Sequence, residues 1–227
     1  GSILSTGDIT KRDLFTLQLP LDGFDAPLTA LRLEALPDDR LPARGPGRCF
    51  YEGRQGDFFL SELTARQDGA AAPFADASQS YGKISIGSGS AAGSGVIDGD
   101  GSTGWSTADG EGRRHELVLN FRQPLAPRGR LQIEMLFERH FAASLGRFRL
   151  SATTSPGLVK ASGLPPELQE LLFRDESQWT PDQRAALERE FARVAPELAE
   201  ARKPIDALRK SLPAELTTLV MQERSAD

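Results

Sequence analysis

Apolar and polar residues alternate along several stretches of the first 160 residues, in the pattern of half-buried β-strands. Between positions 30 and 36, leucine and alanine alternate with Arg32 and Glu34. A period of two places alternate side chains on opposite faces of a strand. Further strand-like runs occupy residues 14–19, 57–65, 82–86, 115–121, 129–137 and 146–153. Glycine and proline turns separate these runs, and the pattern predicts a mainly β protein, an antiparallel β-sandwich of the jelly-roll type.

The pattern changes at Gly163, where leucine, glutamate, alanine, arginine and glutamine become frequent. These residues favour helices. Thr180 and Pro181 have the residue types of an N-cap and a first helical position. We expect helices over residues 167–173, 180–194 and 196–212, the last kinked at Pro204, and an extended segment at 219–221. The last two helices are expected to form an antiparallel hairpin, which gives two domains, residues 1–160 and 161–227.

The segment from residue 96 to 105 contains the most distinctive local chemistry in the chain. It holds Asp98, Asp100 and Thr103 among several glycines, and it ends at Trp105, which we expect to be buried. Glycine lets the backbone turn inward, and converging carboxylate and carbonyl oxygens form calcium sites. Aspartate and glycine are also ordinary turn residues, so a structural turn is the alternative interpretation. The spacing does not match an EF-hand, since the sixth position from Asp98 is Thr103 and not glycine.

Two other loops carry candidate ligand-binding side chains. Residues 37–56 contain too much proline and glycine for a regular element, and loops of this length are often functional. Tyr51 and Arg54 lie in this loop, and the loop before the strand at 146–153 adds three further candidates. Arginine beside aromatic rings suits sugars or carboxylates, although such arginines also serve to hold a loop in place. The candidate ligand-binding residues are Arg139, His140, Phe141, Arg147, Tyr51 and Arg54.

Composition excludes several classes of function. The chain has 227 residues and a formal net charge of −5, whereas nucleic-acid binding usually requires a basic surface. No apolar run approaches the roughly 20 residues of a membrane-spanning helix. Cys49 is the only cysteine, which excludes an internal disulfide. We therefore expect neither a nucleic-acid partner nor a transmembrane segment.

Several motifs, taken in order, resemble one known family. They are Ser2 to Asp8, Thr29 to Glu34 with Gly45 to Arg48, Gly56 to Glu62, Leu145 to Ser151, and Thr218 to Arg224. This series is similar to the central module of large planctomycete-type proteins that carry a c-type cytochrome domain and domains of unknown function. The resemblance implies a segment excised from a larger exported protein, an extracytoplasmic location, and flanking domains of the parent protein as partners.

The central loop also resembles a second group, the discoidin-like, galactose-binding-type β-sandwiches. Asp98-Gly99-Asp100, Thr103 and Trp105 match the Asp-Gly-Asp-x-x-Thr-x-Trp signature of that group, whose loop often holds calcium together with a glutamate from a Ser-Glu strand motif. Ser61-Glu62 resembles that motif, but it precedes the loop, whereas the usual order places it near the domain's C-terminus. The resemblance implies a structural Ca²⁺ ion held by Asp98, Asp100, Thr103 and Glu62.

These observations predict a non-catalytic carbohydrate-binding module with a structural calcium site, binding a glycan or polysaccharide. The arginines favour an acidic polysaccharide. The alternative is an interdomain structural scaffold that positions the flanking domains and binds no soluble ligand. An enzyme is the third interpretation, but no pair of carboxylates is marked by its context as glycosidase machinery, and we expect the module to be non-catalytic.

Overall fold

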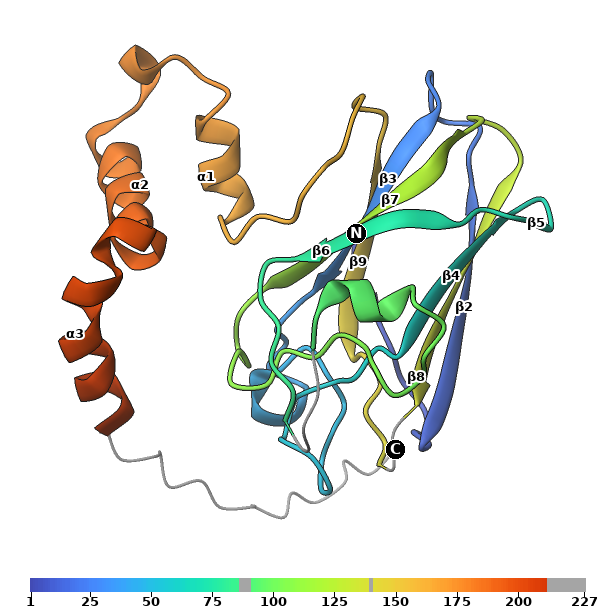
Figure 1. Cartoon of the computed structure of the whole chain (residues 1–227), viewed down its shortest axis with the longest axis horizontal. Helices are drawn as coiled ribbons and strands as arrows, with labels where there is room; N and C mark the ends of the chain where they lie inside the picture. Colours follow the sequence, from blue (N-terminus) through green and yellow to red (C-terminus); the bar gives the residue numbers. More distant parts are fainter. Residues whose placement is uncertain (86–90, 139–140, 212–227) are drawn as a thin grey trace, which may run out of the picture. The chain divides into compact units, whose positions relative to one another are not determined.

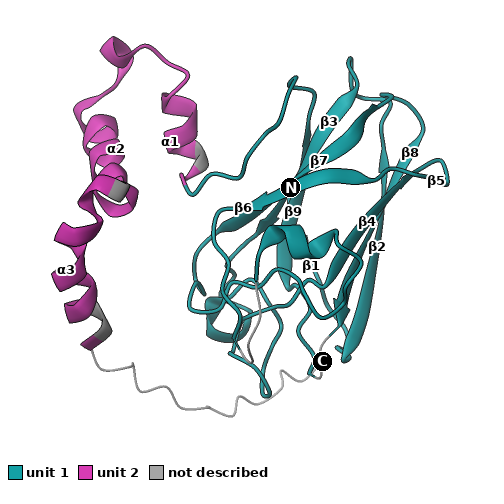
Figure 2. Ribbon diagram, in the orientation of Figure 1, with its two compact units in different colours: residues 1–163 teal, residues 164–227 magenta. Residues whose placement is uncertain are grey.

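A computed structural model describes residues 1–85, 91–138 and 141–211 of the chain. The chain divides into two compact units, residues 1–163 and 164–227, coloured separately in Figure 2. The sequence analysis placed the boundary between residues 160 and 161, close to this division. No helix in the described ranges has both the length and the apolar character needed to cross a membrane.

Unit 1 contains two antiparallel sheets (Figure 1). The five-stranded sheet has the order β1-β9-β3-β7-β6, with β1 Ile3–Leu4, β9 Arg147–Thr153, β3 Leu28–Ala35, β7 His115–Leu125 and β6 Phe74–Gln79. The four-stranded sheet has the order β2-β8-β4-β5, with β2 Arg12–Pro20, β8 Arg130–Glu138, β4 Glu62–Gln67 and β5 Ala70–Ala71. The predicted mainly β, sandwich-like class is confirmed, whereas the jelly-roll and discoidin-like types stay predictions.

A single large core lies behind the alternating strands. Along β8 the odd-numbered positions Leu131, Ile133, Met135 and Phe137 are buried, while the even-numbered ones are at least partly exposed. This alternation follows from the period of two of a strand with one solvated face. The buried side chains of β8 join those of β3, β4 and β7 in one hydrophobic cluster. Burial of this apolar surface is the main stabilising contribution to the fold.

Residues 159–162, here called the exit segment, are fixed to the five-stranded sheet by side chains of β6 and β7. The amide N–H of Val159 donates to Asn120 Oδ1 at 2.9 Å, and Asn120 Nδ2 donates back to the Val159 carbonyl at 2.9 Å. Further bonds join Lys160 Nζ to Asp76 Oδ2 at 2.8 Å, the Ala161 amide to Ser78 Oγ at 2.9 Å, and the Ser162 amide to Glu116 Oε1 at 2.6 Å. The last residues of unit 1 are therefore held on the sheet.

In the described part of unit 2, residues 164–211, the structure has three α-helices, α1 Pro166–Leu171, α2 Pro181–Val194 and α3 Ala199–Ser211. The start of α2 confirms the predicted cap: the Gln183 amide donates to Thr180 Oγ1 at 3.2 Å, and the Thr180 amide donates to Gln183 Oε1 at 2.9 Å. Pro204 lies inside α3, as expected. The expected hairpin of α2 with α3 is corrected, because α2 packs more extensively against α1. The extended segment expected at 219–221 lies outside the described residues.

Two strand assignments made from the sequence also need correction. The sequence analysis assigned no strand to residues 69–77, but Phe74–Gln79 forms β6 and pairs with β7. The weak strand expected at 82–86 makes one isolated parallel bridge, between Lys83 and Thr107, in its described part. Small residues can form an edge strand where a long neighbour such as β7 supplies the hydrogen-bonding partners, since strand propensity depends on tertiary context.

Candidate functional site

The predicted central loop follows a 3-10 turn, Gly93–Val96, and ends at the isolated bridge between Leu60 and Trp105. Trp105 is fully buried, as expected, and its indole Nε1–H donates to the carbonyl of Tyr81 at 2.8 Å. Its ring packs edge-to-face on Phe58, with ring centroids 5.0 Å apart. Both ends of the loop are therefore fixed in the core, and the acidic residues lie between two rigid anchors.

The hydroxyl of Thr103 lies at the centre of a group of oxygen atoms. Its Oγ1 is 3.0 and 2.8 Å from the two carboxylate oxygens of Asp98. It is also 3.2 Å from the carbonyl oxygen of Gly95 and 2.9 Å from that of Asp100. A hydroxyl has one proton to donate, so it can satisfy only one of these four acceptors at a time. The loop thus gathers five hard oxygen atoms into one small volume.

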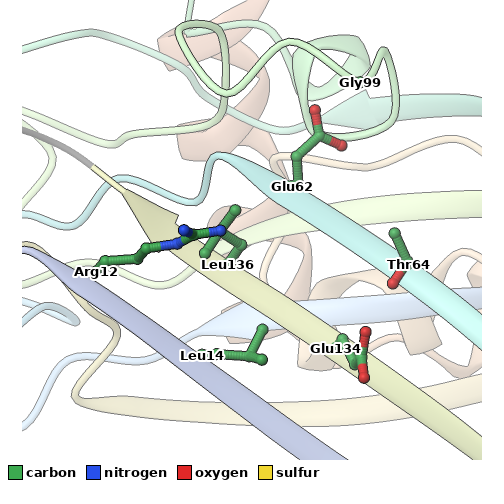
Figure 3. Close-up of a pocket in the computed structure, with 7 residues that line it drawn as sticks. All are labelled: Arg12, Leu14, Glu62, Thr64, Gly99, Glu134 and Leu136. Atoms are coloured by element: carbon green, nitrogen blue, oxygen red, sulfur yellow. The ribbon is translucent and has the colours of Figure 1, made fainter.

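Glu62, at the start of β4, adds a further carboxylate to this group. Burial raises the pKa of Glu62, the nearby Asp98 charge raises it further, and a hydrogen bond from the Gly99 amide lowers it. Within the described part of the chain, Glu62 Oε1 is buried without a hydrogen-bond partner. Figure 3 shows the Glu62 side chain directed from β4 toward the loop at Gly99. Two adjacent carboxylates repel one another unless a proton or a cation lies between them.

Oδ1 of Asp98 accepts from the Asp100 amide at 2.9 Å, and the side chain of Asp100 makes a turn contact of the same kind. Its Oδ1 accepts from the Ser102 amide at 2.9 Å and from the Ser102 hydroxyl at 2.7 Å, and these bonds lower its pKa. Only the carbonyl of Asp100 faces Thr103. The carbonyl of Asp100, and not its carboxylate, is therefore the candidate ligand from this residue. The carboxylate stabilises the turn, as the structural interpretation of the loop expected.

The oxygen set of this site matches the preferences of Ca²⁺, which binds six to eight hard oxygens including carboxylates and carbonyls. Three carboxylate oxygens come from Asp98 and Glu62, and three neutral oxygens come from Gly95, Asp100 and Thr103. Among the described residues, no three His, Cys, Asp or Glu side chains form a metal-binding cluster. A cation at this site would therefore depend on the backbone carbonyls and the threonine hydroxyl for half of these ligands.

A groove of about 520 Å³ adjoins this site on the outer face of β2, β8 and β4. Antiparallel pairing aligns Leu14 of β2 and Glu62 of β4 with Leu136 of β8, and aligns Thr64 with Glu134 one row further along. Leu14 is 57 % exposed, so the groove offers apolar surface as well as polar groups. Its lining, drawn in Figure 3, consists of Arg12, Leu14, Glu62, Thr64, Gly99, Glu134 and Leu136.

Of the residues predicted to bind a ligand, Tyr51, Arg54, Phe141 and Arg147 lie outside this groove. Tyr51 is 84 % exposed and packs edge-to-face on Phe50, with ring centroids 4.8 Å apart. Arg54 forms salt bridges with Asp109 at 2.6 Å and Glu111 at 2.7 Å. Arg54 therefore joins two loops, which agrees with the alternative that such arginines hold a loop in place.

Of the remaining candidates, the structure describes Phe141 and Arg147. Phe141 is only 3 % exposed and packs with Cys49 and Phe59, so its expected role as a sugar-stacking ring is corrected: the ring belongs to a small hydrophobic cluster. Arg147 lies at the start of β9 and contacts Asp38, 3.2 Å away. Arg139 and His140 lie outside the described residues.

Sequence reasoning missed Asp57, a buried carboxylate 3 % exposed. Its oxygens accept from the Ser106 hydroxyl at 2.8 Å and from the Thr107 amide at 3.1 Å. Burial raises the pKa of Asp57 to about 6, against these hydrogen bonds, which lower it. The available signal was an aspartate placed directly before the apolar run Phe58-Phe59-Leu60. Asp57 joins this run to the segment after Trp105 and supports the far end of the central loop.

Comparison with known proteins adds no relative: no family model, no curated protein and no solved structure matches this chain. The resemblances drawn from the motifs therefore stay predictions, and the function is argued from the geometry above.

Proposed function

We propose that unit 1 is a non-catalytic carbohydrate-binding module in which Ca²⁺ joins the central loop to β4. The observation that carries the proposal is the group of oxygens around Thr103, which includes both carboxylate oxygens of Asp98 and lies beside the buried, unpartnered Oε1 of Glu62. A divalent cation removes the repulsion between Glu62 and Asp98 and satisfies several acceptors at once. Its chemistry here is structural: it supplies positive charge that fixes a glycine-rich loop.

The groove beside this site supports carbohydrate as the ligand class. Sugars present apolar C–H faces and hydroxyl groups together. The groove pairs the apolar surface of the exposed Leu14 and the partly exposed Leu136 with the polar groups of Thr64, Glu134 and Arg12. Ligand sites commonly combine apolar surface with a few placed polar groups. Because Gly99 and Glu62 belong to both features, the cation would also fix one wall of the groove.

Thermal unfolding in the presence of calcium or a chelator tests the metal site. A ligand that binds only the folded state raises the melting temperature as its free concentration rises. We expect Ca²⁺ to raise the midpoint and EDTA to lower it, with Asp98→Asn and Glu62→Gln each removing the response. Asp25→Asn, which changes an exposed aspartate in another turn, should keep the full response. If the unaltered chain shows no response and contains no calcium by elemental analysis, the central loop is an ordinary turn.

A glycan array, repeated with and without calcium, tests the ligand class. We expect binding that requires Leu136 and Thr64, so that Leu136→Ala with Thr64→Ala abolishes it while the calcium response remains. A calcium-responsive protein that binds no glycan on the array would reject carbohydrate binding and keep the metal site.

Unit 2 favours the alternative function, an interdomain scaffold. Several large apolar side chains are exposed on it, including Phe173 at 92 % and Leu208 at 69 %. A pocket of about 560 Å³ lies beside α2, lined by residues such as Trp179, Leu187 and Phe191. Exposed apolar patches of this kind often mark protein contacts. Cross-linking of unit 2 to a flanking domain in the full-length parent protein, lost with Phe173→Ser and Leu208→Ser, would support the scaffold.

A further inference from the structure

A second pocket of unit 1, of about 520 Å³, is dominated by arginine side chains. It lies where the chain leaves β3 and where it enters β9, beside a turn that contains Gly112. Its lining residues are Pro37, Asp38, Asp39, Arg40, Arg44, Gly112 and Arg147. None of them belongs to the calcium site or to the groove of Figure 3.

Asp38 positions two of the three guanidinium groups. Its Oδ1 accepts from the Arg40 amide at 2.9 Å and from Arg40 Nε at 2.8 Å. Its Oδ2 accepts from Arg40 Nη2 at 2.7 Å and from Arg147 Nη1 at 3.2 Å. Hydrogen bonds and charge from Arg40, with the charge of Arg147, hold the pKa of this carboxyl well below its usual range. The buried Asp38 carboxylate therefore orients both Arg40 and Arg147.

Arg44 contributes a third positive charge with little compensation. Its Nε is 3.5 Å from Asp39 Oδ1, and these side chains are 78 % and 93 % exposed, so the pair is weak. Ala43 and Arg44 both have positive φ values, 50° and 55°, in the turn Pro42–Arg44. Non-glycine residues rarely adopt this conformation. The turn places Arg44 at the pocket despite this backbone cost.

The charges in the pocket leave a net excess of one positive charge, since three arginines face the two aspartates. Arg147 Nη2, Arg40 Nη1 and the terminal nitrogens of Arg44 have no partner within the described residues. Arg44 keeps both terminal nitrogens for the paired, parallel hydrogen bonds that a guanidinium makes to a carboxylate, while Arg40 and Arg147 each add a single terminal nitrogen. A monoanion matches the net charge, whereas a dianion such as phosphate would leave a negative excess.

We infer that this pocket binds the carboxylate of an acidic sugar, a uronate unit of a polysaccharide. The pocket exceeds the size of a carboxylate alone and lies within the range of small-ligand sites. Apart from Pro37 and Gly112, every lining side chain is charged, which suits the hydroxyl-rich ring of a sugar and not an aliphatic acid. This inference rests on the proposed carbohydrate-binding function and adds to it a second subsite and a class of sugar.

Titration calorimetry with two trisaccharides of equal size tests the inference, trigalacturonate as the acidic probe and galactotriose as the neutral one. We expect trigalacturonate to bind at low ionic strength and to bind more weakly as salt screens the charges. Arg44→Gln should weaken this binding about tenfold, the order expected for a hydrogen bond to a charged group. Asp39→Asn should strengthen it, because it removes an exposed negative charge from the same pocket.

Arg128→Gln is the matched control, since it removes an exposed arginine from the turn between β7 and β8 and should leave binding unchanged. Equal binding of the two trisaccharides, unaffected by Arg44→Gln, would overturn the acidic subsite and leave the proposed function intact. Inorganic sulfate that competes as strongly as trigalacturonate would show an unselective anion site and also overturn the inference. Failure of both trisaccharides together with an empty glycan array would reject the function itself.

Discussion

Two carboxylates inside unit 1, Asp57 and Glu34, lie in opposite electrostatic surroundings. Asp57 is buried and receives hydrogen bonds from uncharged groups only, and burial raises its pKa to about 6. Burial alone would also raise the pKa of Glu34. Hydrogen bonds from Arg149 and Arg114 and the charge of Arg32 outweigh it and lower that pKa to about 2. The two carboxylates therefore make the stability of the protein depend on pH in opposite directions.

Asp57 makes the folded state bind a proton more readily than the unfolded chain. Between about pH 4 and pH 6 the folded protein therefore holds more protons, and the free energy of unfolding decreases as the pH rises through this interval. The shift of about two units corresponds to up to about 3 kcal/mol. In urea unfolding at a series of pH values, Asp57→Asn should remove this decrease, and Asp25→Asn should leave it. An unchanged pH dependence in Asp57→Asn would contradict the assignment.

Glu34 acts in the opposite sense. Its folded-state pKa of about 2 lies below the ordinary value of 4.5, so the unfolded chain binds the proton first as acid is added. The stability that Glu34 contributes is complete above about pH 4.5 and is lost as the pH falls toward 2. We expect Glu34→Gln to lower stability at neutral pH and to flatten the acid limb of the same unfolding series. Glu52→Gln, at an exposed position, is the comparison variant.

At the scale of elements, the sequence predicted those strands whose alternation is strong. β2, β3, β8 and β9 each have a regular period of two, and the structure has them within a few residues of the expected bounds. β6 was missed because its sequence has no apolar period; β7 supplies the pairing partners of Asp76 and Ser78 instead. The N-cap of α2 was predictable because its two hydrogen bonds lie within four consecutive residues.

The central loop requires glycine at position 104. A Cβ atom on Gly104 would lie 2.3 Å from the carbonyl oxygen of Leu60, the oxygen that accepts from the Trp105 amide at 2.9 Å. We expect Gly104→Ala to destabilise unit 1 by about 2 kcal/mol or more, as overpacking against backbone does. Gly101→Ala is the control, because a Cβ there meets no atom within 4 Å. Chemical denaturation of both variants compares them directly, and equal stabilities would refute the close contact.

At the scale of the whole molecule, contacts between residues close together in the sequence were predictable from it. Contacts of the candidate site that depend on the order of the strands were not. Asp98 and Thr103 lie five positions apart, so their contact follows from the loop sequence. Glu62 was assigned to them by resemblance alone, and the groove depends on the order β2-β8-β4, which brings Leu14, Leu136 and Thr64 onto one face. No local pattern encodes a sheet order, and the arginine pocket depends in the same way on β3 and β9 being neighbours.

The exit segment defines where unit 1 ends. A chain that stops at Thr153 would leave Asn120 and Glu116, each 2 % exposed, without their partners Val159 and Ser162. Net contributions of about 1 kcal/mol for each hydrogen bond imply a loss of several kcal/mol. We expect residues 1–153 to melt roughly 5–10 °C below residues 1–163 in a thermal scan followed by circular dichroism. Equal midpoints would show that the exit segment contributes nothing to stability.

The same segment has a mechanical consequence. Tension on the chain beyond Gly163 reaches Ser162 first and Val159 last, so the bonds to Glu116, Ser78, Asp76 and Asn120 are loaded one after another. Their rupture releases about 13 Å of slack, since an extended residue spans roughly 3.3 Å. The exit segment therefore yields to a pull, bond by bond, before the load reaches β9 along the chain.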